Sequence, residues 1–394
     1  MTQAPAKAPE SGPFRTDYRL ADSLEAASGR VFLTGVQALV RLALMQAARD
    51  AKRGIASRGF ISGYRGSPLG MVDQAAWKAA PLLGKAGVHF LPAINEELAA
   101  TAVLGTQRVE SDPERTADGV YAMWYGKGPG VDRAGDALKH GNAYGSSAHG
   151  GVLVVAGDDH GCVSSSMPHQ SDGAFQAWQM PIVAPANVAE YLEFGLYGWE
   201  LSRFSGNWVG LTALSEVVES GATVDLDETA RRVGAWRPAA EVEALTGYVR
   251  PADGLHYRWP DLPSLKIEER LLAKLGAVRA FARINSIDRE IVSAPQATVG
   301  IVSCGKAHFD LLEVFRRLDI SLDSLAAAGV RLYKVGLSFP LEPTRAAAFA
   351  SGLQEILVVE EKAGLVEAHL RYLYYHAPLR PVIFVKHDAD GLPL

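Results

Sequence analysis

Two adjacent carboxylates, Glu96 and Glu97, follow an apolar run at residues 91–94 and open a segment rich in Ala, Gly and Leu. Asn95 before them is a good N-cap, and acidic residues in a first helical turn interact favourably with the helix dipole. Both can therefore be ordinary helix-start residues. Alternatively, one carboxylate is buried beside an uncharged base, where loss of solvation raises its pKa and lets it share a proton. This segment alone leaves both interpretations open.

The segment GYRGSPLG, residues 63–70, follows a predicted strand and combines three glycines with Ser67 and Pro68. Glycines let a backbone approach a ligand closely, and the Ser67 hydroxyl could donate a hydrogen bond to an anionic group. The segment is not a phosphate-binding P-loop, because no Gly-Lys-Ser/Thr ending follows it. By itself it is more typical of a tight turn in which Pro68 starts a helix.

Two further loops carry many polar groups. Residues 126–142, GKGPGVDRAGDALKHGN, contain five glycines together with Lys127, Arg133 and His140. Two interpretations explain this pattern equally well. The segment binds a phosphate or carboxylate, or it is a flexible loop followed by a solvated helix face. Residues 157–172, GDDHGCVSSSMPHQSD, gather histidine, cysteine, serine and aspartate after an apolar strand. Such a concentration is uncommon in a mere connection and indicates a functional loop.

Alternating elements are expected to position these loops. Strands alternate with helices through the first half of the chain, which predicts an α/β fold with a parallel, doubly wound sheet. The loops then lie at the carboxyl edge of the strands, where such sheets bind ligands. Residues 224–263 are expected to form an extended connection before a charged helix. We expect a mobile tail at 1–25, a first domain at 26–225, a linker and helix at 226–290, and a smaller αβ domain at 291–394.

The composition excludes several classes of protein. A net charge of -5 gives no reason to expect nucleic acid or an anionic membrane as partner. No run of about 18 apolar residues occurs, so we expect no membrane span. Cys162 and Cys304 are the only cysteines, which excludes a disulfide framework and favours a cytoplasmic protein. An iron–sulfur cluster within the chain is excluded too, because it needs four ligands, most of them cysteine.

Four segments, taken in order, resemble the indolepyruvate ferredoxin oxidoreductase family, most closely its fused bacterial type. They are GYRGSPLG, INEELAATAVLGTQ, WYGKGPGVDRAGDALKHGN and GGVLVVAGDDHGCVSSSMPHQSD. The resemblance extends to GLSFPLEP and EILVVEEKAGLVEAHLRYLYY. It implies a thiamine diphosphate enzyme that oxidatively decarboxylates aryl 2-oxoacids to acyl-CoA and passes electrons through iron–sulfur clusters to ferredoxin. The first block would then be the pyrimidine-type thiamine diphosphate-binding domain, and the second a transketolase C-terminal-like domain.

The resemblance also implies roles for single residues. Glu96 would be the catalytic glutamate that hydrogen-bonds the aminopyrimidine of the cofactor and favours the tautomer that deprotonates the thiazolium carbon. Gly66, Ser67 and Pro68 would form a cofactor-binding loop, with Ser67 also near the substrate carboxylate. The remaining substrate-binding positions would be His140, His169 and Gln170.

Metal binding is not expected within the chain. His160, Cys162 and His169 could supply zinc ligands, but their spacing fits no standard pattern. Asp158 and Asn187 have nearly the separation of the Mg²⁺ ligands in thiamine enzymes. The second glycine of that motif is absent, however, and Asn187 is placed to be the N-cap of the following helix.

Mg²⁺ and iron–sulfur clusters are therefore expected only outside this chain, which resembles the N-terminal portion of the fused relatives. We expect a truncated or split version that shares thiamine diphosphate with another domain or chain and is inactive alone. Its expected partners are diphosphate-domain and ferredoxin-type subunits or a homologous dimer mate, together with ferredoxin and CoA. Two alternatives remain at this point. One is a non-catalytic scaffold or regulatory subunit from a split or truncated gene, and the other is a cofactor-free ligand-binding protein.

Overall fold

The large sheet of the protein has seven strands in the order β12-β6-β7-β5-β4-β2-β3. The computed structural model describes residues 17–163, 165–258, 264–377, 380–384 and 386. The strands are β2 (Arg58–Gly63), β3 (Val88–Phe90), β4 (Val120–Lys127), β5 (Val152–Gly157), β6 (Ile182–Val183), β7 (Val209–Thr212) and β12 (Leu337–Phe339). All neighbours are parallel except the β12–β6 pair at one edge.

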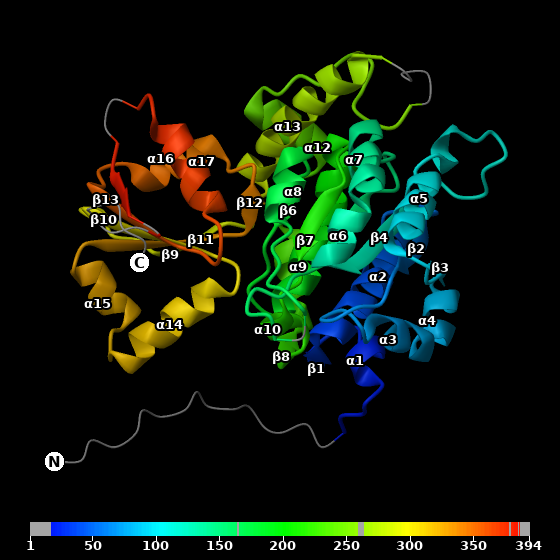
Figure 1. Cartoon of the computed structure of the whole chain (residues 1–394), viewed down its shortest axis with the longest axis horizontal. Helices are drawn as coiled ribbons and strands as arrows, with labels where there is room; N and C mark the ends of the chain where they lie inside the picture. The colour runs from blue at the N-terminus through cyan, green and yellow to red at the C-terminus, as the bar shows by residue number, and fades with distance from the viewer. Residues whose placement is uncertain (1–16, 164, 259–263, 378–379, 385, 387–394) are drawn as a thin grey trace.

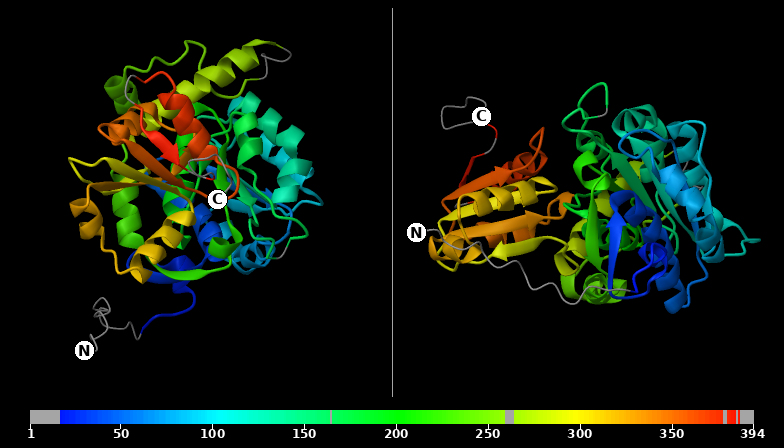
Figure 2. Two further views of the ribbon diagram at one scale, coloured as in Figure 1. Left: turned by 60° about the vertical axis from the view of Figure 1, so that its left-hand side comes forward. Right: turned by 90° about the horizontal axis from the view of Figure 1, so that it is seen from below.

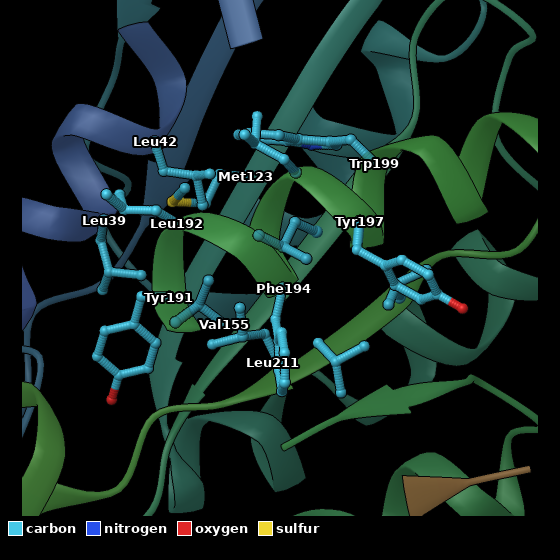
Figure 3. Close-up of a cluster of buried hydrophobic side chains, with 14 of the residues drawn as sticks. Leu39, Leu42, Met123, Val155, Tyr191, Leu192, Phe194, Tyr197, Trp199 and Leu211 are labelled. Atoms are coloured by element: carbon cyan, nitrogen blue, oxygen red, sulfur yellow. The ribbon is translucent and has the colours of Figure 1, made fainter. Parts of the chain in front are cut away.

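Helices cover both faces of this sheet, which confirms the doubly wound α/β fold (Figure 1). Successive residues of the central strands point to opposite faces: Met123 and Val155 to one, Trp124 and Val154 to the other. The first face packs on α2 (Gly35–Lys52), α3 (Val72–Lys78), α4 (Ala80–Lys85), α9 (Val188–Ser205) and α13 (Lys266–Ile284). The second packs on α5 (Glu96–Thr106), α6 (Gly128–Arg133), α7 (Gly135–Tyr144) and α8 (Asp172–Ala177). Figure 3 shows the first core, with Leu39 and Leu42 of α2 beside Met123 and the aromatic residues of α9.

Side-chain caps fix where several of these helices begin. At the start of α2, the hydroxyl of Thr34 accepts from the backbone N–H of Gln37. The side chain of Gln37 in turn accepts from the backbone N–H of Thr34. Asn95 caps α5 and Asn187 caps α9 in the same way, each through its side-chain oxygen. The N-cap roles predicted for both asparagines are confirmed.

A second, five-stranded sheet lies beside the first, with the order β14-β13-β10-β11-β9 (Figure 2). Its strands are β9 (Arg289–Val292), β10 (Val299–Cys304), β11 (Val330–Val335), β13 (Glu355–Val359) and β14 (Val382–Phe384), of which only β9 is antiparallel to its neighbour. The helices α14 (Ala307–Arg317), α15 (Leu322–Ala327), α16 (Pro343–Ala350) and α17 (Leu365–Tyr374) accompany it. This sheet forms the smaller αβ block expected from the sequence.

The two sheets are tied together by a strand and by buried ion pairs. Strand β12 leaves the second block and pairs with β6 at the edge of the large sheet. Next to it, Lys334 of β11 pairs with Glu190 of α9, and Arg289 of β9 lies 2.5 Å from Glu193 of the same helix. Because α9 is part of the first core, these contacts hold the second sheet on the first.

Several local expectations are corrected. β1 (Arg30–Thr34) does not enter the parallel sheet but pairs antiparallel with β8 (Gly221–Asp225). Its alternate residues are exposed, Phe32 among them, which suits a strand covered on one face only. Residues 224–263 are not simply extended, because they form α11 (Leu226–Gly234) and α12 (Ala239–Thr246), while 259–263 lie outside the described residues.

The expected tail at 1–25 lies mostly outside the described residues, although its end forms the short helix α1 (Asp22–Glu25). The remaining short elements are η1 (Val109–Ser111) and α10 (Ser215–Val218). No helix in the described parts of the chain has the length and hydropathy needed to cross a bilayer.

The first testable prediction concerns Arg203 of α9. Its guanidinium makes two 2.7 Å bonds to the Asp50 carboxylate of α2 and donates to the carbonyl of Gly150, just before β5. Arg203→Met leaves a buried carboxylate uncompensated and should lower the free energy of unfolding by about 3–5 kcal/mol, measured by urea denaturation. Arg231→Met, which removes an exposed partner of Glu228, is the control and should change little. Equal effects of the two variants would contradict the prediction.

Candidate functional site

The loops singled out in the sequence meet at one edge of the large sheet. Strands β2, β4 and β5 are parallel neighbours, with Gly63 opposite Tyr125 and Lys127 opposite Gly157. Their carboxyl ends therefore lie side by side, and the segments that follow each strand share one edge.

Glu96 and Glu97 occupy different environments at the start of α5. Glu96 is 5% exposed, whereas Glu97 faces solvent. The backbone carbonyl of Glu96 accepts from the indole N–H of Trp124 at 3.0 Å, which holds the helix start against β4. The charged group nearest to its carboxylate is Arg133, whose Nε lies 3.8 Å from Oε2 and whose side chain is 58% exposed. Among the described residues, the ion-pair partner of this buried carboxylate is thus a largely exposed arginine at 3.8 Å.

Helix α6 lies between Glu96 and His169 and touches both through glycines. A Cβ at Gly130 would lie 2.7 Å from Cγ and Oε1 of Glu96. A Cβ at Gly128 would lie only 2.1 Å from Nδ1 of His169. No larger residue fits at either position without a shift of these side chains. The glycines of the 126–142 segment therefore serve close approach, in addition to any role in binding.

The 63–70 loop folds over the ends of β4 and β5. A Cβ at Gly66 would lie 2.8 Å from the Lys127 side chain, and one at Gly157 would meet Leu69 and Pro68 at 2.8–3.1 Å. Ser67 is half-buried in this loop, and the peptide bond between it and Pro68 is cis. Pro68 lies in a turn but does not start a helix, since α3 begins at Val72.

His169 is enclosed by two carboxylates. Its Nε2 lies 2.9 Å from Oδ2 of Asp132 on α6, and its Nδ1 lies 3.4 Å from Oδ1 of Asp158 after β5. The hydrogen bond to Asp158 raises the pKa of His169 and outweighs the opposing effect of burial; with the bond to Asp132 it brings the pKa to about 9. The ring is therefore an imidazolium at neutral pH, with both N–H groups facing carboxylates.

Other polar groups of the 157–172 loop bond within the loop or face the second sheet. Asp158 is fully buried and accepts from the backbone N–H and the hydroxyl of Ser171 at 2.8 and 2.7 Å. The Gln170 amide donates to Asp172 and accepts from the backbone N–H of Ala363, after β13. Burial and the charge of Asp158 raise the pKa of Asp172 to about 6. This loop thus contacts α6 on one side and the second sheet on the other.

The contacts of His140 among the described residues lie within its own helix and do not connect it to Glu96 or His169. Its Nδ1 lies 2.8 Å from the carbonyl oxygen of Asp136, and its ring packs edge-on to Tyr144, both on its own helix α7. The zinc ligand set His160, Cys162 and His169 is likewise divided: His160 bonds Glu361, and Cys162 bonds the carbonyl of Ser165.

Asp132 was not predicted as a partner of His169. It lies within the glycine-rich segment 126–142, but no local sequence pattern pairs it with a histidine that follows 37 residues later.

Two solved structures share this fold. The chain superposes on 2-oxoglutarate:ferredoxin oxidoreductase from Magnetococcus marinus with a TM-score of 0.64 and 15% identity, over 93% of this chain and 63% of that one. A split-gene transketolase described as an inactive beta4 tetramer gives a TM-score of 0.51 and 13% identity over 90% of both chains. These likenesses define the class of α/β fold.

Sequence comparison finds similarity to indolepyruvate oxidoreductases. Residues 289–392 match the family model described as the indolepyruvate oxidoreductase domain. The chain is 26% identical to indolepyruvate oxidoreductase subunit IorA of Methanothermobacter marburgensis over 349 residues, 88% of this chain and 49% of the relative. Similarity to IorA of Archaeoglobus fulgidus is the same, at 26% over 348 residues. The resemblance to the indolepyruvate ferredoxin oxidoreductase family is confirmed, and the chain spans about half the length of the curated relatives it matches.

The second prediction concerns the charge of His169. Because the pKa in the folded chain is about 9 and the ordinary value is 6.5, the imidazolium stabilises the fold fully below about pH 6.5. That contribution is lost as the pH rises through about 9. Titration followed by NMR should give a His169 pKa well above 7, lowered by Asp132→Asn. Asp136→Asn, whose carboxylate pairs with His140, is the control and should leave it unchanged. A pKa at or below 6.5 would contradict the enclosure of His169 by carboxylates.

Proposed function

We propose that the chain is the pyrimidine-binding part of a thiamine diphosphate-dependent oxidoreductase that acts on aryl 2-oxoacids of the indolepyruvate type and reduces ferredoxin. The similarity to IorA subunits supports the reaction class, and the burial of Glu96 at the shared strand edge is the single observation that carries the proposal. Residues 26–225 would be the pyrimidine-type domain. Residues 291–394, nearly the span that matches the indolepyruvate oxidoreductase domain, would be the transketolase C-terminal-like domain.

The environment of Glu96 suits a neutral nitrogen base. A buried carboxylate is costly unless it is paired or hydrogen-bonded, and the Arg133 contact of 3.8 Å exceeds hydrogen-bond length. An aminopyrimidine ring nitrogen placed against the carboxylate would share a proton with it through a hydrogen bond. Glu96 would then hold a proton at that nitrogen and set the tautomer of the ring. The bound cofactor supplies an electron sink for decarboxylation of the 2-oxoacid.

Exposed apolar side chains surround Glu96 and point to a protein partner. Ile94 is 83% exposed, Leu91 49% and Leu98 48%, and all three lie within five positions of the buried carboxylate. Apolar groups that flank a functional residue in this way are typical of an interaction surface. We infer that a diphosphate-binding domain, from another subunit or a homologous dimer mate, covers this surface and closes the site over Glu96.

The chain fits only the pyrimidine end of the cofactor. Asn187 has the approximate spacing of a Mg²⁺ ligand from Asp158, but its side-chain oxygen accepts from the backbone N–H of Glu190 as a helix cap. We expect Mg²⁺, the diphosphate site and the iron–sulfur clusters to lie outside this chain, in an assembly with further subunits that uses ferredoxin and CoA.

Substrate contacts are proposed at the same edge. Gly66, Ser67 and Pro68 would line the cofactor, with the Ser67 hydroxyl toward the 2-oxoacid carboxylate. His169, whose two ring nitrogens face Asp132 and Asp158, would line the substrate position, with Gln170 beside it. His140 is half-exposed on α7 and would contact the substrate from a position separate from that of Ser67 and His169.

A non-catalytic scaffold or regulatory subunit is the alternative function. It would use the contacts between the two sheets and the apolar surface around Glu96, but it would not require the carboxylate. Substitution of Glu96 therefore separates the two functions.

The third prediction tests Glu96 in the complete assembly of this chain with its partner subunits. With thiamine diphosphate, Mg²⁺, CoA and indolepyruvate, Glu96→Gln should lower the rate of ferredoxin reduction about 10²–10⁴-fold. The reason is that an amide cannot exchange a proton with the ring nitrogen of the aminopyrimidine as the carboxylate does. The matched control Glu97→Gln changes an exposed neighbour and should stay within about twofold. Full activity of Glu96→Gln would favour the scaffold function.

The fourth prediction uses the close contact between Gly130 and Glu96. Gly130→Ala places a methyl group 2.7 Å from Cγ and Oε1 of Glu96 and should displace the carboxylate, lowering the rate at least about tenfold without loss of assembly. Gly173→Ala, on α8, meets nothing within 4 Å and should retain activity. If both variants keep the unchanged rate, the position of the Glu96 carboxylate is not critical to the reaction.

A further inference from the structure

Three ligand-type side chains converge where the loop after β5 meets the second sheet. One nitrogen of His160 and one carboxylate oxygen each of Asp158 and Asp172 lie within 4.8 Å of one another. Asp158 is fully buried, and Asp172 is 9% exposed. The residues come from one loop, at its start and at its end where α8 begins. None of the three residues is assigned a contact with substrate or cofactor in the proposed reaction, although Asp158 also faces His169.

The surroundings of His160 are a second observation that points to a ligand at this place. Its side chain is 10% exposed, and its Nδ1 lies 2.8 Å from Oε2 of Glu361, after β13. Its Nε2 is buried and has no hydrogen-bond partner among the described residues. A histidine whose one ring nitrogen is held by a carboxylate, with the other nitrogen left over, has the arrangement of a metal ligand with its outer-shell partner.

The charges around the group favour a cation. Asp158 accepts from Ser171 and faces His169 at 3.4 Å, while Asp172 accepts from Gln170. No Lys or Arg of the described ranges pairs with either carboxylate. Lys306 lies nearby but pairs with Glu361, at 3.1 Å, and with Asp310. Each carboxylate keeps lone pairs that these contacts do not use.

We propose that Asp158, His160 through Nε2, and Asp172 bind one divalent transition-metal ion of the Zn²⁺ or Mn²⁺ type, with Glu361 orienting the histidine. An imidazole ligand favours these ions over Mg²⁺ and Ca²⁺, and both ions also accept carboxylate oxygens as ligands. Three protein ligands leave at least one coordination position open. A small cavity adjoins the group between the sheets, and its walls include Cys304, Lys306 and Glu361.

The consequence is a metal-dependent link between the two sheets. The ion would be held by the loop after β5, and its histidine is bonded to a residue of the second sheet. Gln170 of the same loop already contacts Ala363 there. Binding to the folded state only should raise the stability of the chain by mass action.

The test uses the full chain after treatment with a chelator. Titration calorimetry with Zn²⁺, Mn²⁺ and Mg²⁺ as separate probes should give one site per chain for Zn²⁺ and Mn²⁺, and much weaker binding of Mg²⁺. Thermal unfolding should show a higher Tm with Zn²⁺ than with chelator. Absence of binding, or Mg²⁺ binding as tight as that of Zn²⁺, would overturn the proposal.

Variants assign the ligands. His160→Ala and Asp172→Asn should each weaken Zn²⁺ binding at least about 100-fold, and Glu361→Gln about 10–100-fold as an orienting residue. The control His149→Ala removes an exposed histidine that also pairs with a carboxylate, Glu110, and should bind as the unaltered chain does. Unchanged binding in both ligand variants would contradict the assignment.

X-ray absorption of the Zn²⁺-loaded unaltered chain keeps the test decisive if a variant fails to fold. The proposal predicts a single imidazole nitrogen with oxygen ligands and no sulfur. Because Cys304 lines the adjoining cavity, a sulfur ligand would show a different site and refute the proposed one.

Discussion

The candidate site depends on a steric constraint at the start of α6. Gly128 and Gly130 leave no room for a Cβ on either side of this short helix, against His169 and Glu96 respectively. Helix α6 packs between α5 and the central strands β4 and β5. Two side chains from distant segments can therefore approach the same backbone, one a buried carboxylate and the other an imidazolium. Opposite charges are held at fixed positions along one sheet edge, which is the arrangement that the proposed chemistry requires.

The loop after β5 connects this edge to the rest of the molecule. Asp158 at its start faces His169, while His160, Gln170 and Asp172 face the second sheet. The same loop therefore contributes to both the proposed active site and the proposed metal site. Together with β12 and the ion pairs of α9, it fixes how the two sheets sit against each other. A structural change where this loop meets the second sheet should therefore alter the surroundings of His169, because Asp158 contacts that histidine.

The sequence predicted the features that follow from local pattern. Strand–helix alternation gave the doubly wound α/β fold, and side-chain chemistry gave the helix caps Asn95 and Asn187. Pairings between distant segments were not predictable in this way: β12 joins the edge of the first sheet, β1 pairs with β8, and His160 meets Glu361 across 201 positions. Glu96 could be separated from Glu97 only by resemblance, and the structure adds a difference in burial that no local pattern contains.

The central claim is that Glu96 supplies the carboxylate for a thiamine diphosphate shared with another domain. A cryo-electron microscopy structure of the complete assembly with thiamine diphosphate bound measures this contact directly. The account predicts a Glu96 carboxylate oxygen within about 3.2 Å of the aminopyrimidine ring nitrogen, with Ile94 and Leu98 covered by the diphosphate-binding partner. A cofactor held away from the ends of β2, β4 and β5, or contacted by Glu97 in place of Glu96, would contradict it.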